Sequence, residues 1–292
     1  MKLTGFFCQQ PQPAADLSPM SPNSTELLDF IEQLKADGLT IVDDPKSVHS
    51  VEKAKHYISR IGHYRFKQYS EPFTRILNKN PATIVCGLDD IMKLQKFDRQ
   101  LRLLSLDALE RIEVTMKSYL HDHLVTMYGK DWFLNNNSNI PSSLTNSIEK
   151  SLKRHPDMKE KSHSELRHVD TNLLMSAITF GETSRLYNAL DEPNQSNIAK
   201  RFSTGSAILR SWLWSLTHIR NTAAHHSRLW NITSITPPRI PPVIKQRFGG
   251  ITPPDFYNER FYGQALVLFY LLQRIARHTK WHYRLFEPCL SG

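Results

Sequence analysis

One uninterrupted stretch decides the fold of this chain: DDIMKLQKFDRQLRLLSLDALERIEVTMKSYLHDHLVTMY, residues 89–128. Its apolar side chains recur at steps of three to five residues, mostly three or four, which is the spacing of one helix face. At about 1.5 Å per residue such a helix would be roughly 60 Å long, so a break or bend near Ser105 stays open. We predict a central helix against which others pack, through the stripe Leu94, Phe97, Leu101, Leu104, Ala108, Ile112, Met116, Tyr119 and Leu124.

Shorter segments on both sides carry the same helical period. They cover residues 24–38, about 47–61, 173–187, 208–219 and 261–281. Strand-like alternation is not convincing anywhere, and glycine is scarce, at 11 of 292 residues. Few glycines leave little material for tight hairpins or phosphate-cradling loops. The prediction is therefore an all-α fold, a helical bundle with an extended N-terminal helical region and irregular loops.

We divide the chain into a flexible lead-in and one helical domain. Residues 1–22 hold four prolines and little periodic pattern, which is typical of a flexible segment. Six prolines between Pro237 and Pro254 predict an irregular crossing. The domain spans residues 23–285, with an N-terminal helical part at about 23–135, a mobile basic excursion with one short helix at about 136–165, a motif-bearing part at about 166–235, and a C-terminal helix at about 256–283.

Charge and cysteine content narrow the class of protein. The net charge of +9 raises the expectation of a polyanionic partner but does not choose between nucleic acid, an anionic membrane and plain solubility. Cys8, Cys86 and Cys289 are odd in number and far apart, which favours neither a disulfide framework nor a thiolate zinc site. The longest apolar run, residues 265–272, is too short to span a bilayer. We expect a soluble cytoplasmic protein that makes no use of a membrane.

The densest group of polar side chains follows an aromatic helix, in SWLWSLTHIRNTAAHHSRLWN, residues 211–231. Residues embedded among core-forming aromatics are held rigidly, as catalysis requires. At 100° per residue, Arg220 and His225 lie ~140° apart on a straight helix, whereas Asn221, His225 and Arg228 share a face. If Arg220 and His225 serve one site, either the helix bends or a second copy related by two-fold symmetry supplies part of it.

An Arg–His pair without carboxylates or metal ligands suits the cleavage of RNA. The 2′-hydroxyl of the substrate attacks the adjacent phosphorus, histidine takes or gives the proton, and arginine stabilises the charge on the phosphoryl oxygens. On the residues alone, a structural network or a helix cap is the simpler interpretation of the same cluster.

The order of several motifs resembles the Abi-like abortive infection proteins of bacteria (AbiD/AbiF type), over about residues 24–232. The stretch Arg220-Asn221-Thr222-Ala223-Ala224-His225 is similar to the signature of the HEPN superfamily, an arginine followed four to six residues later by a histidine. The other matching segments are Gly38-Leu39, residues 61–66 (IGHYRF), residues 97–102 (FDRQLR), Ile112-Glu113, Tyr128-Gly129 with Trp132, Phe180-Gly181 with Tyr187, and residues 229–231 (LWN).

This resemblance implies a metal-independent endoribonuclease in anti-phage defence, a toxin controlled by a partner such as a small inhibitory RNA. It implies no cofactor, and an active site formed where two HEPN units meet, hence a homodimer or higher homo-oligomer. Arg220 and His225 would be the catalytic pair and Asn221 an orienting residue, with His226 and Arg228 assigned to RNA binding. The alternative is a non-catalytic HEPN module that binds RNA or protein and acts through assembly.

Other polar segments have two interpretations each. Tyr64, Arg65 and Lys67 lie in an alternation of aromatic and basic residues that suits base stacking and phosphate contact, or else packs partly into the core. The basic stretch Lys150–Lys161 holds RNA or is merely solvated. His121 and His123 point apart on a helix, which argues against a metal site. Phe97-Asp98-Arg99 together with Arg102 is expected to form a structural ion-pair network rather than a site.

Overall fold

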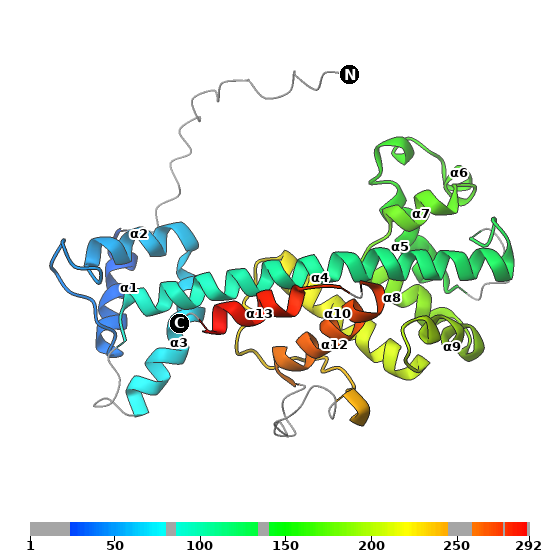
Figure 1. The fold of residues 1–292 in the computed structure, drawn as a ribbon. Helices are drawn as coiled ribbons and strands as arrows, with labels where there is room; N and C mark the ends of the chain where they lie inside the picture. The colour runs from blue at the N-terminus through cyan, green and yellow to red at the C-terminus, as the bar shows by residue number, and fades with distance from the viewer. Residues whose placement is uncertain (1–23, 80–85, 134–139, 245–258, 277, 291–292) are drawn as a thin grey trace, which may run out of the picture. The chain divides into compact units, whose positions relative to one another are not determined.

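The computed structural model describes residues 24–79, 86–133, 140–244, 259–276 and 278–290, so the expected lead-in at 1–22 lies outside the described residues. The prediction of an all-α fold is confirmed (Figure 1): apart from two isolated β-bridges, the described part of the chain contains helices and irregular segments only. None of the described helices is both long and apolar enough to cross a membrane. The chain divides into two compact units, residues 1–96 and 97–292, where the sequence predicted one domain.

The described residues of the first unit form three helices and the start of a fourth. They are α1 (Ser24–Ala36), α2 (Val51–Ile61) and α3 (His63–Lys79). Helix α2 begins later than predicted because the Ser50 hydroxyl caps it, accepting the backbone N–H of Lys53. The hydrophobic core of the first unit is formed by Ile31, Leu34, Leu39, Ile41, Val51, Ala54, Ile58, Phe66, Tyr69, Cys86, Leu88 and Ile91.

The predicted central helix is present as α4 (Leu88–Tyr128), which contributes its first residues to the first unit and the rest to the second. The helix is continuous through Ser105, where the sequence had left a break or bend possible. The Ser105 hydroxyl is fully buried and donates to the carbonyl oxygen of Leu101 at 2.7 Å. A buried hydroxyl satisfied within its own helix needs no opening of the backbone.

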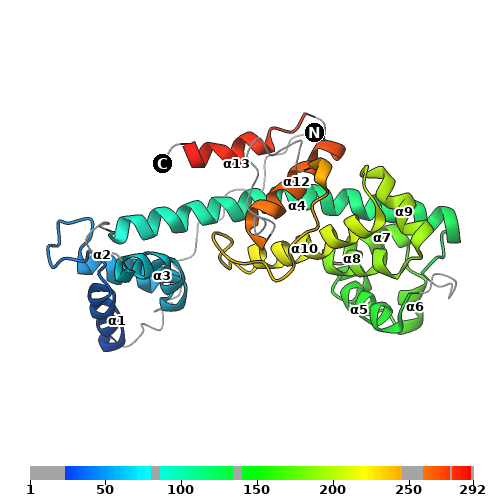
Figure 2. The ribbon, with the colours of Figure 1, turned by 90° about the horizontal axis from the view of Figure 1, so that it is seen from below.

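The second unit is built from short helices around α4 and one longer helix, α10 (Ser206–Ala224). Helix α10 packs on α8 (Phe180–Ala189), α9 (Glu192–Arg201) and α12 (Phe261–Ile275), as Figure 2 shows. The remaining elements are α5 (Ser142–Leu152), a 3₁₀ turn at Pro156–Met158, α6 (His163–Arg167), α7 (Thr171–Ala177) and α13 (Trp281–Leu290).

The basic excursion contains the short helix that the sequence predicted, as α5, and two further short helical elements begin within it. Leu144, Ile148 and Leu152 of α5 are buried in the core, so α5 is an amphipathic helix of the unit. The single C-terminal helix is instead two. Helix α12 ends where Ala276 turns to an extended conformation, and Trp281 then places its indole N–H 2.8 Å from the Leu104 carbonyl oxygen.

Of the proline-rich crossing, residues 237–241 are irregular as predicted, residues 242–244 are helical against the prediction, and residues 245–258 lie outside the described residues.

Candidate functional site

Helix α10 is held in the second unit by one apolar face. Leu209, Trp212, Leu216, Ile219 and Ala223 recur at steps of three or four and are all at most 2% exposed. The Trp212 indole N–H donates to the carbonyl oxygen of Arg239 at 2.7 Å, so its polar edge is satisfied as well. The helix is therefore a fixed support for the polar residues at its C-terminal end.

The C-terminal end of α10 is a Schellman motif. The backbone N–H of His226 donates to the Ala223 carbonyl oxygen at 3.1 Å, and that of Ser227 donates to the Thr222 carbonyl oxygen at 2.9 Å. His225 is the C-cap, and His226 takes the left-handed conformation, with φ of 59°. The helix thus stops beside the histidines and turns the chain sharply.

This turn corrects the expected geometry of the cluster. Asn221, His225 and Arg228 cannot share one helix face, because α10 ends at Ala224 and Arg228 lies beyond the turn. Arg228 is half-buried and has interactions of its own.

Four polar side chains at this end have no hydrogen bond or ion pair with the described residues. They are those of Arg220, Asn221, His225 and His226. Arg220 is half-buried, while the other three are exposed. A half-buried guanidinium loses part of its hydration, and without a partner nothing offsets this desolvation free energy. These side chains are available to a ligand or to another chain.

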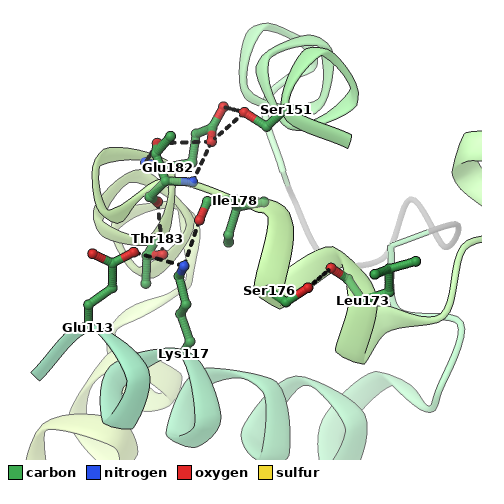
Figure 3. A network of polar contacts seen from close by, with 9 residues as sticks. Glu113, Lys117, Ser151, Leu173, Ser176, Ile178, Glu182 and Thr183 are labelled. Carbon is green, nitrogen blue, oxygen red and sulfur yellow. Dashed lines mark hydrogen bonds and ion pairs between the residues drawn. The ribbon is translucent and has the colours of Figure 1, made fainter. Parts of the chain in front are cut away.

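Arg220 lines an open depression against α4 with three carboxylates nearby, those of Asp107, Glu110 and Glu113. Glu113 pairs with Lys117 at 2.8 Å, and Asp107 pairs with Arg111 at 2.9 Å. Lys117 also donates to the Ile178 carbonyl oxygen at 2.6 Å, as Figure 3 shows, so its charge is already engaged. Glu110 is exposed and has no ion pair in the described parts of the chain.

The chain beyond the turn is fixed to α4. Asp98 accepts the backbone N–H groups of Leu229 and Trp230, and forms the ion pair with Arg102 that the sequence predicted. Further along, Arg260 donates to the carbonyl and side-chain oxygens of Asn231, both at 3.3 Å.

Trp214 was expected in the aromatic core but is 58% exposed, whereas Trp212 is fully buried. By the helical repeat, Trp214 lies within about 20° of Asn221 and His225 around the axis of α10. Sequence reasoning missed it as a candidate, although its spacing of seven and eleven residues from those two residues already indicated the shared face.

The predicted RNA-contacting residues Tyr64, Arg65 and Lys67 belong to α3 in the first unit and are not grouped with Arg220 and His225 within one unit. Tyr64 is 78% exposed, Lys67 is exposed and Arg65 is half-buried, while Phe66 between them is fully buried. The alternative interpretation, in which this segment packs partly into the core, therefore holds for Phe66 and not for Tyr64.

The two histidines of α4 and the basic stretch lie away from this cluster. His121 contacts the Thr171 hydroxyl at 2.9 Å and His123 the Asn194 side-chain oxygen at 2.7 Å, so each binds a different helix. In Lys150–Lys161, all five lysines and arginines (Lys150, Lys153, Arg154, Lys159 and Lys161) are exposed.

The same unit contains a buried carboxylate with a structural role (Figure 3). Glu182 is 3% exposed and accepts hydrogen bonds from the hydroxyls of Ser147 at 2.6 Å and Ser151 at 2.9 Å. It also forms a capping box with Thr179 at the start of α8. Burial alone would raise the pKa of Glu182, but the combined hydrogen bonds from Ser147, Thr179 and Ser151 lower it below its ordinary value.

Comparison with known families gives one finding that covers this region. Residues 56–231 match the family model described as Abi-like protein. The matched range includes all of α3, the end of α10 and the hydrogen bonds of Asp98 to Leu229 and Trp230, and it ends at Asn231. Comparisons with curated proteins and with solved structures give no match.

Proposed function

Because the chain belongs to the Abi-like protein family, we propose that it is a HEPN-type endoribonuclease that acts in bacterial abortive infection, as a toxin restrained by a partner such as a small RNA. Arg220 and His225 are the proposed catalytic pair, and Asn221 orients the substrate. The observation that carries this proposal is the unpaired state of all three side chains at the fixed end of α10.

The proposed reaction needs only groups that this site and RNA supply. His225 accepts the proton of the 2′-hydroxyl as its oxygen bonds to phosphorus, and the bond from phosphorus to the 5′-oxygen breaks. The products are a 2′,3′-cyclic phosphate and a 5′-hydroxyl, because the protonated His225 returns the proton to the departing 5′-oxygen. Arg220 stabilises the charge on the non-bridging oxygens, and its half-buried position strengthens that interaction. We propose that a second copy of the chain completes the site.

The test is cleavage of a single-stranded RNA in the presence of EDTA. We expect Arg220→Ala and His225→Ala to lower the rate about 100-fold or more, as loss of an acid–base or charge-stabilising group does. Lys130→Ala is the control, because Lys130 is exposed and its side chain makes no hydrogen bond or ion pair with the described residues. Cleavage of the matching DNA, or full activity in both variants, would contradict the mechanism.

One observation favours the alternative of a non-catalytic module. Of the carboxylates that line the depression beside Arg220, Glu110 has no ion pair among the described residues, so it disfavours an incoming phosphate and suits a basic partner. Folded wild-type protein that binds RNA or a protein partner without producing any RNA fragments would support this second function.

A further inference from the structure

Asp98 is a buried carboxylate with backbone partners far along the chain. It is fully buried on α4, and one of its oxygens accepts the N–H of Leu229 at 2.9 Å and that of Trp230 at 2.6 Å. Its other oxygen pairs with Arg102, itself 6% exposed. Two adjacent backbone donors thus converge on a single charged acceptor.

These bonds hold the segment that follows the proposed catalytic histidine. The Schellman motif fixes the start of this segment at His225, and Asp98 fixes its end at Leu229. Only His226, Ser227 and Arg228 lie between the two anchors. A shift of Leu229 therefore reaches His225 through a very short length of chain.

Stability alone is a weak explanation for such a pair. Replacing a buried ion pair by apolar residues of similar volume is often neutral or stabilising, because the desolvation of both charges offsets their attraction. Charged acceptors do, however, form shorter and more directional hydrogen bonds than neutral ones. The arrangement of Asp98 is better suited to placing a backbone segment than to adding stability.

We infer that Asp98 is a positioning residue, which sets the place of His225 relative to Arg220 by holding the backbone of Leu229 and Trp230. This inference rests on the proposed ribonuclease function. Asp98 forms no hydrogen bond or ion pair with either proposed catalytic side chain, so its loss should lower kcat and leave KM within about twofold. A displacement on the order of 1 Å costs up to about 100-fold in rate.

Two double variants separate the backbone contact from the buried charge. Asp98→Asn/Arg102→Met and Asp98→Ala/Arg102→Met both remove the ion pair, but only the asparagine keeps a side-chain oxygen that accepts the two N–H groups. We expect the asparagine pair to stay within about fivefold of the wild-type kcat and the alanine pair to fall 10-fold to 100-fold. Equal kcat values in the two folded pairs would overturn the inference.

Glu182→Gln is the matched control for lost stability, because Glu182 is an equally buried hydrogen-bonded carboxylate elsewhere in the unit. It should cleave RNA at the wild-type rate at temperatures where it is folded. If its kcat falls as far as that of the alanine pair at matched stability, Asp98 has only a structural role. If the alanine pair does not fold, Asp98→Leu/Arg102→Met, which removes both acceptor oxygens but keeps a similar side-chain volume, takes its place in the same comparison.

Amide hydrogen exchange gives a measurement that does not depend on activity. In the alanine pair, the amides of Leu229 and Trp230 should exchange at least 10-fold faster than in the asparagine pair, with the amides of α10 unchanged. If wild-type protein cleaves no RNA, the proposed function fails, and this measurement still decides whether Asp98 holds the segment. Unchanged exchange at both amides would overturn the inference whatever the activity.

Discussion

The backbone N–H of Ser227 donates to the carbonyl oxygen of Thr222 at 2.9 Å and closes the end of α10 around His226. At this turn the backbone of His226 is in the left-handed conformation, with φ of 59°. This conformation is strained for a residue with a Cβ atom, whereas glycine adopts it without a clash. We therefore expect His226→Gly to raise the free energy of unfolding by about 1 kcal/mol, measured by chemical denaturation.

Helix α9 offers a matched control for this prediction. It ends in the same motif, with Ser203 at φ of 54° and the N–H of Thr204 donating to the Ala199 carbonyl oxygen at 3.2 Å. Ser203→Gly should stabilise the protein by a similar amount and leave RNA cleavage unchanged. A loss of stability in both variants would show that the backbone turns are not strained.

Trp214→Ala tests whether the exposed face of α10 binds the substrate. If RNA bases stack on Trp214, on the same face of α10 as Asn221 and His225, loss of the indole should weaken RNA affinity about 10-fold, since stacking is worth about 1–3 kcal/mol per base. The variant should keep its stability, because the side chain is 58% exposed. Fluorescence anisotropy with labelled RNA measures the effect.

Trp214→Phe keeps an aromatic face and should retain most of the affinity. If Trp214→Ala binds RNA normally but dissociates into smaller assemblies on dilution, Trp214 contacts another chain and not the substrate. Sedimentation at several protein concentrations separates the two results.

The sequence predicted the elements that depend on local pattern. Helix α4 begins at Leu88, one residue from its predicted start, because its apolar period is long and free of proline. The end of α10 could not be predicted, since the left-handed position is usually glycine and here is His226. The exposure of Trp214 followed from helix spacing, but the aromatic surroundings suggested a core position.

The sequence pattern alone could not predict contacts between segments that lie far apart in the chain. An ion-pair network of Asp98 and Arg99 with Arg102 was expected because these charged residues lie close together in the sequence, and the pair between Asp98 and Arg102 is present. The bonds from Leu229 and Trp230 to the same carboxylate depend on how α10 packs, and no local signal encodes them. The division of the chain after Lys96 falls inside a continuous helix, where no linker marks it.

Glu182→Gln should change how stability depends on pH. The folded-state pKa of Glu182 is lowered, so its ionised form stabilises the protein above its ordinary value of 4.5, and this contribution is lost as the pH falls through the folded-state value. At pH 7 the variant should lose about 1–3 kcal/mol, the usual cost of weakening a buried charged hydrogen-bond group. The difference from wild type should shrink below pH 4.5 in denaturation curves.

Glu165→Gln is the exposed counterpart of this variant. Glu165 forms a capping box with Ser162 on α6, and hydrogen bonds from the Ser162 hydroxyl and backbone lower its pKa to about 2. Water can replace these bonds at the surface, so its loss should destabilise the protein less. An equal effect in both variants would contradict the role given to burial.

Glu110 is the carboxylate whose removal should strengthen RNA binding. It lines the depression beside Arg220 and, unlike Asp107 and Glu113, has no ion pair in the described parts of the chain. Glu110→Gln removes the repulsion of a phosphate near Arg220. We expect RNA affinity to rise about threefold at low salt and less at high salt, because exposed charges are screened.

Asp131→Asn makes the same change of net charge at an exposed residue beyond the end of α4, and should have a smaller effect on RNA affinity. Binding isotherms at two salt concentrations distinguish the variants. If both raise the affinity equally, only net charge matters; if Glu110→Gln weakens binding, the depression accepts a basic group, as the non-catalytic alternative requires.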